Sequence, residues 1–425
     1  MSIMKYYIET YGCWLNKADS QLIEEQLRRL GYVKVPEPSE ADLIIINTCA
    51  VREDSEAREL KRIEELSKLG ARLIVAGCLT KARPSEIRRI APGALLATPN
   101  SVEHFTEVLS GKYLDEPREM AKIPEYNPLN GHIYVVPIQV GCLGNCTYCV
   151  IKYTRGGMGW VKSANIDDVV EKVAKAVSLG AREIYLTGQE VSAYGKDKGY
   201  DLVDLLERIL KRVEGRYMIR LGMLEPLELD KILDRLIDVV KGDWRIYRFF
   251  HIPVQSGSDK VLRIMRRKYT VDLFRGEVLK IRRAFEDSFI ATDIIVGHPG
   301  EDDEDFQESV RLVKELEIDK VHVARYSPRP FTEASYMKQV PDRVKKERSS
   351  ILSKVALEVS LSRNMKYVNG VYEGIVSSRG FMGRGFMVRL MDYRPVIVKE
   401  AYLGSFVKVK VTGATPINLI GEVIE

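Results

Sequence analysis

Six cysteines could do chemistry in this chain, and three of them lie in one short segment. The segment GCLGNCTYC, residues 141–149, places Cys142, Cys146 and Cys149 in the spacing C-x3-C-x2-C, and no cysteine occurs after it. Structural zinc sites take four ligands, and electron-transfer iron–sulfur clusters also take four thiolates. Three thiolates that hold a 4Fe–4S cubane leave one iron without a protein ligand. The spacing therefore favours a cluster whose open iron can bind a substrate or a cofactor.

The other three cysteines form a second set. Cys13, Cys49 and Cys78 are 36 and 29 residues apart, and each follows an apolar segment with the composition of a strand. Charged segments with helical spacing separate these strands, and this alternation predicts a parallel sheet. The carboxyl ends of parallel strands share one edge of the sheet, where ligands bind. We expect the three thiols to converge at that edge.

Other interpretations of the cysteines involve different chemistry. One is a zinc knuckle that borrows Cys13, and another is a thioredoxin-like redox pair of Cys146 and Cys149. For the second set, the alternative is three buried structural cysteines. The division into three plus three argues against zinc, and the redox pair leaves Cys142 without a function.

The rest of the chain supplies the elements that must position these residues. After a charged, proline-containing linker at 114–131, six apolar segments alternate with helical ones, as in three-quarters of an eight-fold strand–helix barrel. A helical segment at 341–363 then leads to five short alternating strands, typical of a small barrel of the oligonucleotide-binding kind. The predicted fold class is α/β: an N-terminal parallel-sheet α/β domain (1–125), a partial (β/α)6 barrel with its connector helix (126–362), and a small all-β barrel (363–425).

Composition describes an ordinary globular chain. Of its 425 residues, 45% are hydrophobic and 29% are charged, which is enough to build sizeable cores. No apolar run is long enough to span a bilayer, and the N-terminus lacks the pattern of a secretory signal. We therefore expect a cytoplasmic protein with no membrane partner.

Positive charge is concentrated near the C-terminus. Nine Lys or Arg face five Asp or Glu after residue 362, so this segment carries most of the net charge of +5. Interleaved arginines and aromatic rings suit RNA phosphates and exposed bases. The alternative is a solvated strand face over ordinary core aromatics. The candidate RNA-binding residues are Arg379, Arg384, Phe386, Arg389 and Arg394.

Several motifs together resemble one enzyme family. C-x3-C-x2-C at the start of a strand–helix barrel resembles the radical S-adenosylmethionine enzymes. The segments LTGQEVSAYG, HIPVQSGSDKVLRIMRRKYT, TDIIVGHPGE and YSPRPFTEA are similar to the methylthiotransferase branch, as are ETYGCWLNKADS and NTCAVRE near the N-terminus. Members of that branch combine an N-terminal three-cysteine domain, a radical S-adenosylmethionine domain and a C-terminal RNA-binding TRAM barrel. The resemblance covers essentially the whole chain.

The resemblance implies two 4Fe–4S clusters and S-adenosyl-L-methionine as cofactors. Cys142, Cys146 and Cys149 would hold the cluster that cleaves S-adenosylmethionine to a radical. Cys13, Cys49 and Cys78 would hold an auxiliary cluster that carries the sulfur. A sulfur donor and an electron donor of flavodoxin or ferredoxin type would be partners. The expected cofactor-binding residues are Tyr148, Gln189, Arg220 and Gln255.

The substrate follows from a closer resemblance. YTRGG, the acidic Glu190 and RLGMLEP look like the branch that acts on N6-threonylcarbamoyladenosine next to the tRNA anticodon, where the isopentenyladenosine branch usually has Asn at the position of Glu190. The expected enzyme is a tRNA methylthiotransferase that modifies carbon 2 of this nucleoside. Alternatives are the isopentenyladenosine enzyme, the relative that modifies a ribosomal-protein aspartate, and a non-catalytic iron–sulfur RNA-binding redox regulator. Phe331 stands where relatives usually place Gly, so we expect a different backbone there.

Overall fold

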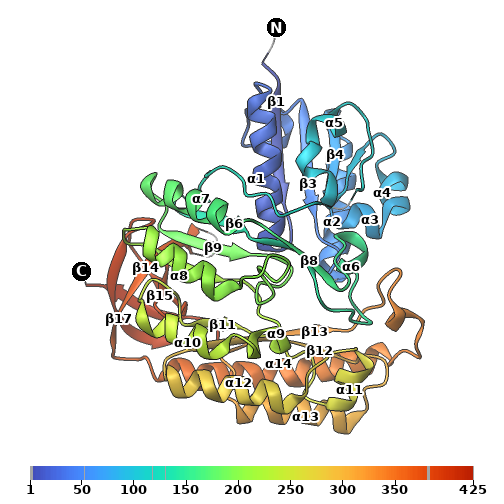
Figure 1. Ribbon diagram of the computed structural model, residues 1–425. Helices are drawn as coiled ribbons and strands as arrows, with labels where there is room; N and C mark the ends of the chain where they lie inside the picture. Colours follow the sequence, from blue (N-terminus) through green and yellow to red (C-terminus); the bar gives the residue numbers. More distant parts are fainter. Residues whose placement is uncertain (1–2, 52, 117, 130, 381–382, 425) are drawn as a thin grey trace.

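The computed structural model describes residues 3–51, 53–116, 118–129, 131–380 and 383–424. Figure 1 shows three regions that pack on one another along the chain: a sheet with helices near the N-terminus, a central open ring of strands and helices, and a C-terminal group of strands. Within the described ranges, no helix is long and apolar enough to cross a membrane.

The N-terminal region is a five-stranded, fully parallel sheet in the order β2-β1-β3-β4-β5. Its central strands are short runs of aliphatic residues that are buried on both faces, as parallel sheets require. Helices cover the two faces, and the sheet lies between two apolar cores, one on each face. The strands are β1 (Lys5–Thr10), β2 (Val33–Lys34), β3 (Leu43–Thr48), β4 (Arg72–Gly77) and β5 (Leu95–Ala97), and the helices are α1 (Trp14–Arg29), α2 (Glu53–Ser67), α3 (Leu79–Ala82), α4 (Pro84–Ile90) and α5 (Phe105–Leu109), with 3-10 turns at Pro38–Glu40 and Pro99–His104.

Six parallel strands form the central region, in two sheets of three. Parallel bridges join Ile219 to Ile246 and Met223 to His251, so the two sheets continue into one curved ring. The ring is open between its first and last strands, which confirms the predicted partial barrel. Its strands are β6 (Ile133–Pro137), β9 (Glu183–Thr187), β10 (Met218–Leu221), β11 (Phe249–His251), β12 (Phe289–Val296) and β13 (Lys320–Arg325).

Helices surround this ring on the outside. α8 shows why they form where they do, because Asp201 and Asp204 make a capping box at its N-terminus and its apolar side chains are buried against the strands. The helices are α7 (Ile166–Ser178), α8 (Leu202–Arg212), α9 (Pro226–Asp230), α10 (Leu233–Gly242), α11 (Asp259–Ile264), α12 (Val271–Ala284), α13 (Asp303–Glu315) and α14 (Asp342–Met365), with a 3-10 turn at Glu333–Tyr336.

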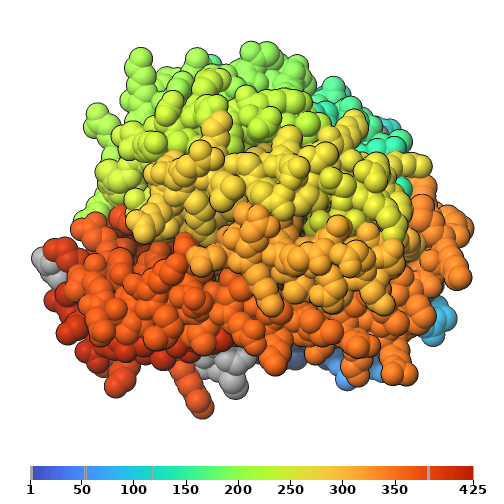
Figure 2. Space-filling view, turned by 90° about the horizontal axis from the view of Figure 1, so that it is seen from below, coloured from blue at the N-terminus to red at the C-terminus, as the bar shows by residue number. Residues whose placement is uncertain are grey.

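Five C-terminal strands close into a barrel in the order β14-β15-β16-β18-β17, which confirms the expected small all-β barrel. They are β14 (Val371–Arg379), β15 (Phe386–Leu390), β16 (Pro395–Val398), β17 (Phe406–Ala414) and β18 (Leu419–Val423). The barrel lies directly beside α14 (Figure 2), where the Asn364 side chain donates to the Thr415 carbonyl at 2.7 Å.

The terminal barrel also closes the amino-terminal ends of the central strands. Tyr393 and Ile375 join a buried cluster with Tyr185, Tyr247 and Phe249, which point into the ring. The Tyr393 hydroxyl lies 3.0 Å from that of Tyr185. One end of the ring is therefore plugged, and the carboxyl ends of its strands are left for the site.

Candidate active site

All six cysteines line a single cavity of about 550 Å³. Cys13, Cys49 and Cys78 follow β1, β3 and β4 at the carboxyl edge of the N-terminal sheet. The other three follow the first strand of the central ring. The carboxyl ends of strands from two regions therefore line one space, and this arrangement brings both cysteine sets to the same cavity.

A small hairpin shapes the loop that carries the first set. β7 (Gln139–Cys142) pairs antiparallel with β8 (Trp160–Ser163), and Cys142 is the last residue of β7. Gly141 and Gly157 have φ of +89°, and a Cβ on Gly157 would lie 2.2 Å from the Gly141 Cα. Only glycine fits this crossing, which folds the loop back on itself, with the short helix α6 (Ile151–Thr154) after Cys149.

Two groups donate to the sulfurs of the first set. The Gly144 backbone N–H donates to the Cys142 Sγ at 3.3 Å, and an Arg267 guanidinium nitrogen donates to the Cys146 Sγ at 3.2 Å. Burial raises the pKa of Cys142 to about 12 and that of Cys149 to about 11. Burial thus favours the protonated form of Cys142 and Cys149, and a bound cation would favour their thiolates.

The second set is gathered around Arg155, six residues after Cys149. Burial raises the pKa of Cys49 to about 12, and the nearby Cys78 and Cys13 add to this effect. Burial also raises the pKa of Cys78, while the adjacent Arg155 guanidinium opposes the shift. Gly12 is required beside them, because a Cβ there would lie 2.9 Å from the Cys49 Cβ. The three thiols are thus electrostatic neighbours, as the sequence predicts.

Neither cysteine set forms a compact site for a single ion. A tetrahedral zinc ion with Zn–S bonds of about 2.3 Å holds its sulfurs roughly 3.8 Å apart. Over the described ranges, the one set of three candidate ligand atoms that all lie within 4.8 Å is that of His251, Asp293 and His322, and it includes no cysteine. Three thiols in one cavity supply the type of ligand that a cubane cluster takes.

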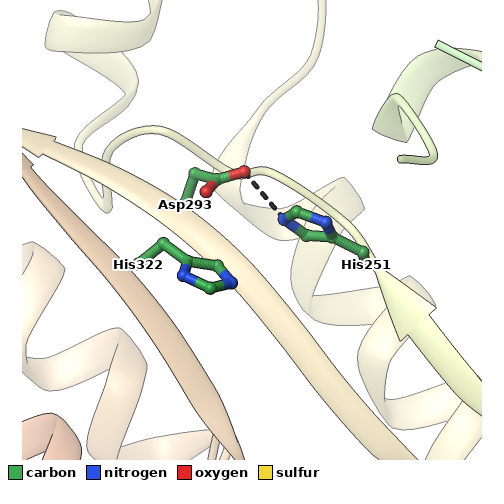
Figure 3. Close-up of side chains that lie close together, drawn as sticks. All are labelled: His251, Asp293 and His322. Carbon is green, nitrogen blue, oxygen red and sulfur yellow. Dashed lines mark hydrogen bonds and ion pairs between the residues drawn. The ribbon is translucent and has the colours of Figure 1, made fainter. Parts of the chain in front are cut away.

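The three side chains in Figure 3 come from neighbouring strands of the ring, β11, β12 and β13. The His251 Nε2 lies 2.8 Å from the Asp293 Oδ2, and the His322 ring centroid lies 5.5 Å from that of His251. Asp293 and His322 also line the cavity. These groups could contact a nucleobase or a divalent cation, and the His251–Asp293 pairing already satisfies two of them without an ion.

The predicted cofactor residues have different positions in the structure. Tyr148, Gln189 and Gln255 line the cavity. The Gln189 amide braces the cysteine loop: its Oε1 accepts from the Gly141 N–H at 2.7 Å and its Nε2 donates to the Gly156 carbonyl at 3.1 Å. Gln255 has φ of +70°, a conformation that costs free energy and often marks functional sites.

Arg220 is not among the residues that line the cavity, and its contact with the cofactor stays a prediction. It is buried inside the ring, with its guanidinium carbon 4.9 Å from the ring centroid of Phe249, 5.2 Å from that of Tyr393 and 5.5 Å from that of Tyr185. Cation–π contacts of this kind stabilise a buried arginine. Its position therefore links the central strands to the terminal barrel.

The predicted RNA-binding residues divide into two groups. Arg379 and Arg384 are exposed, and the guanidinium of Arg379 lies over the half-buried ring of Phe386. Arg394 is fully buried and pairs with Asp319 at 2.7 Å, which corrects the predicted RNA contact. The partly buried Arg389 is also turned inward: it stacks on the Tyr393 ring at 4.2 Å and donates to the Tyr393 carbonyl.

Sequence reasoning missed several residues that line the cavity. Lys152, Arg155, Arg267 and Arg329 each carry a cation into this space. Glu225 also lines it, with its Oε1 3.6 Å from the Arg267 Nη2. No spacing rule points to the four cations, since each has a partner more than a hundred residues away in the chain. The backbone at Phe331 has φ of +67°, a conformation that favours glycine, so the loop keeps a glycine-like backbone despite the larger residue.

Comparison with known proteins agrees with this geometry. Residues 136–313 match the Radical SAM superfamily, and residues 5–97 match the uncharacterized protein family UPF0004. Among solved structures, the radical S-adenosylmethionine methyltransferase TsrM from Kitasatospora setae has a similar fold, with a TM-score of 0.55 at 12% identity over 79% of this chain and 75% of that one. The central region thus defines a radical S-adenosylmethionine enzyme, a class that uses a 4Fe–4S cluster and S-adenosylmethionine.

Relatives that match nearly the whole chain identify a family within this class. The probable threonylcarbamoyladenosine tRNA methylthiotransferase of Pyrococcus abyssi is 38% identical over 99% of this chain and 100% of its own. The human threonylcarbamoyladenosine tRNA methylthiotransferase is 32% identical over 96% of this chain and 72% of its own. A tRNA-2-methylthio-N(6)-dimethylallyladenosine synthase of Alkaliphilus oremlandii is 33% identical over 99% of this chain and 93% of its own. The chain belongs to the tRNA methylthiotransferase family.

Proposed function

We propose that this enzyme places a methylthio group on carbon 2 of N6-threonylcarbamoyladenosine next to the anticodon of tRNA, in the cytoplasm. One observation carries the proposal: two separate sets of three cysteines open into the same cavity. Sulfur insertion needs a radical source and a sulfur source within reach of one carbon atom. Relatives named for the threonylcarbamoyladenosine substrate reach 38% identity over the full chain, which supports this nucleoside.

Each cysteine set has a separate task in this proposal. Cys142, Cys146 and Cys149 would hold a 4Fe–4S cluster together with S-adenosylmethionine. Cys13, Cys49 and Cys78 would hold a second 4Fe–4S cluster. When bound, these groups would supply radical chemistry and the sulfur to be inserted. An external sulfur donor and a flavodoxin- or ferredoxin-type electron donor would supply sulfur and electrons.

The protein residues position these groups and exclude water. Gln189 fixes the loop of the first set through Gly141 and Gly156. Arg155 stands between the two regions, next to the thiols of the second set. Glu190 lines the cavity, and burial raises its pKa to about 7. The exposed arginines of the terminal barrel hold the tRNA through its phosphates.

Anaerobic reconstitution followed by mass spectrometry of tRNA nucleosides tests this function. Incubation with S-adenosylmethionine, a reductant and threonylcarbamoylated tRNA should yield the 2-methylthio nucleoside. Product on isopentenyladenosine tRNA alone would assign the other tRNA branch, and product on a ribosomal-protein aspartate would assign the protein-modifying relative. Failure of the reduced protein to form any 5′-deoxyadenosine would favour a redox regulator without turnover.

A further inference from the structure

Arg329 has two buried nitrogens that form no hydrogen bond within the described structure. It follows β13 in the loop at the rim of the cavity, it lines the cavity, and it is only 4% exposed on its side chain. Its Nη1 donates to the Glu56 Oε2 of α2. Its Nε and Nη2 have no hydrogen-bond partner among the described residues. Leaving such donors unpaired in a buried place is unfavourable, so a ligand that accepts from them is favoured.

The neighbouring cations of the cavity are already engaged. Arg155 pairs with Asp19 at 2.6 Å, and Lys152 pairs with Glu333 at 3.0 Å. Arg267 donates to Tyr269 at 2.8 Å as well as to Cys146. Unlike these three, Arg329 keeps one edge of its guanidinium free.

Glu56 does not satisfy Arg329 by itself. It accepts from Arg83 as well, through its other oxygen at 2.9 Å, so two guanidinium groups share one carboxylate. Glu86 reaches Arg83 at 3.5 Å from a more exposed position. The free Nε and Nη2 form the planar edge that binds a carboxylate with two parallel hydrogen bonds. The free edge therefore offers two hydrogen-bond donors to an oxyanion.

We propose that Arg329 binds the carboxylate of the threonyl group on the substrate nucleoside. The inference rests on the proposed function, because the threonylcarbamoyl group carries a carboxylate that unmodified adenosine and the dimethylallyl group lack. A single site then explains how the cavity recognises the prior modification and rejects the bare base. Arg329 acts here by binding the modification, away from carbon 2.

The test compares three forms of one tRNA: threonylcarbamoylated, unmodified, and carrying the methyl ester of the threonylcarbamoyl group. Wild-type enzyme should prefer the free acid. Arg329→Gln should lower kcat/KM for the free acid by about 10- to 100-fold, as the loss of a charged hydrogen-bonded contact predicts. It should bind unmodified tRNA as wild type does, and it should no longer distinguish the acid from the ester.

Two further variants separate binding from structure. Glu56→Gln removes the ion pair between the two regions but leaves the free edge of Arg329, so it should still distinguish acid from ester. Arg329→Lys keeps the charge but loses the planar edge. Its kcat/KM for the free acid should lie between that of wild type and that of Arg329→Gln. Iron content and circular dichroism report whether each variant folds.

Three results would overturn the inference. One is equal discrimination between acid and ester in Arg329→Gln and in wild type. Another is an equal loss of affinity for modified and unmodified tRNA in Arg329→Gln, which would assign Arg329 to a phosphate. The third is loss of discrimination in Glu56→Gln with full iron content. If the wild-type enzyme makes no methylthiolated product on the free acid, this result contradicts the proposed function itself and not only the role of Arg329.

Discussion

Arg155 and Asp19 form a buried ion pair across the boundary between the N-terminal sheet region and the central ring. The Nη2 of Arg155 lies 2.6 Å from the Asp19 Oδ2, while Arg118 binds the other oxygen of the same carboxylate at 2.8 Å. Burial lowers the pKa of Arg155, but Asp19, Cys78 and Cys13 outweigh this effect and raise it, so the group stays charged. One arginine thus ties the loop of the first cysteine set to the thiols of the second.

Breaking this pair should loosen the two cysteine sets relative to each other. Asp19→Ala leaves two buried guanidinium groups without their carboxylate, which should cost about 3–5 kcal/mol of stability. It should also lower the yield of methylthiolated nucleoside per 5′-deoxyadenosine formed. Asp167→Ala is the matched control, because Asp167 forms exposed pairs with Arg208 and Arg212 and should cost less than about 1 kcal/mol. Equal effects in denaturant titrations would contradict the interpretation.

Removing the first cysteine set should abolish radical formation. Two 4Fe–4S clusters hold about eight irons per chain, so a triple alanine variant of Cys142, Cys146 and Cys149 should contain about half of that iron. It should form no 5′-deoxyadenosine, which liquid chromatography of the reaction mixture detects. If the triple variant still cleaves S-adenosylmethionine, the radical cluster is elsewhere.

The second set should be required for sulfur insertion alone. A triple alanine variant of Cys13, Cys49 and Cys78 should lose the other half of the iron and continue uncoupled cleavage of S-adenosylmethionine. It should make no methylthiolated nucleoside, as judged by mass spectrometry of the tRNA digest. Normal amounts of that product would show that the second cysteine set is not required for sulfur insertion.

Two arginines of the terminal barrel should behave in opposite ways. Arg384→Ala removes an exposed charge, and should weaken tRNA binding and reduce the slope of log affinity against log salt by roughly one unit per lost phosphate contact. Arg394→Ala should instead lower the free energy of unfolding by a few kcal/mol, because Asp319 and Asp392 are buried beside it. Salt-dependent binding and thermal melts distinguish the two; a salt effect confined to Arg394→Ala would reverse the assignment.

Glu277 should make the protein less stable as the pH rises. It is buried on α12, neither carboxylate oxygen has a hydrogen-bond partner in the described structure, and burial raises its pKa to about 10. The unfolded chain releases this proton near pH 4.3 and the folded chain retains it, so stability falls between these values by up to about 1.4 kcal/mol per pH unit. Glu277→Gln should flatten this part of the curve in melts from pH 6 to 8. A curve unchanged by the substitution would show that Glu277 ionises in place.

The sequence by itself determined the elements of the fold and the grouping of the cysteines into two sets. Short aliphatic runs such as Leu43–Thr48 form buried parallel strands because their side chains are apolar on both faces. Alternating segments near the C-terminus form a closed barrel because every second side chain is apolar and is buried inside it. Cys13, Cys49 and Cys78 each follow a parallel strand, so strand order alone brings these thiols to one edge. Cys142, Cys146 and Cys149 are close together because they lie in one short segment. These are local patterns, which a single sequence displays directly.

Only the tertiary structure decided which polar residues face the cavity and which face the interior. Arg384 and Arg394 have the same type and similar sequence surroundings, yet one is exposed and the other is buried against Asp319. Arg220 is likewise held by aromatic rings, one of them Tyr393, more than 170 residues away along the chain. The partners of these arginines come from distant segments whose contact depends on how the regions dock, and no spacing within the sequence encodes that contact. The free edge of Arg329 arises in the same way, since its partner Glu56 is 273 residues away.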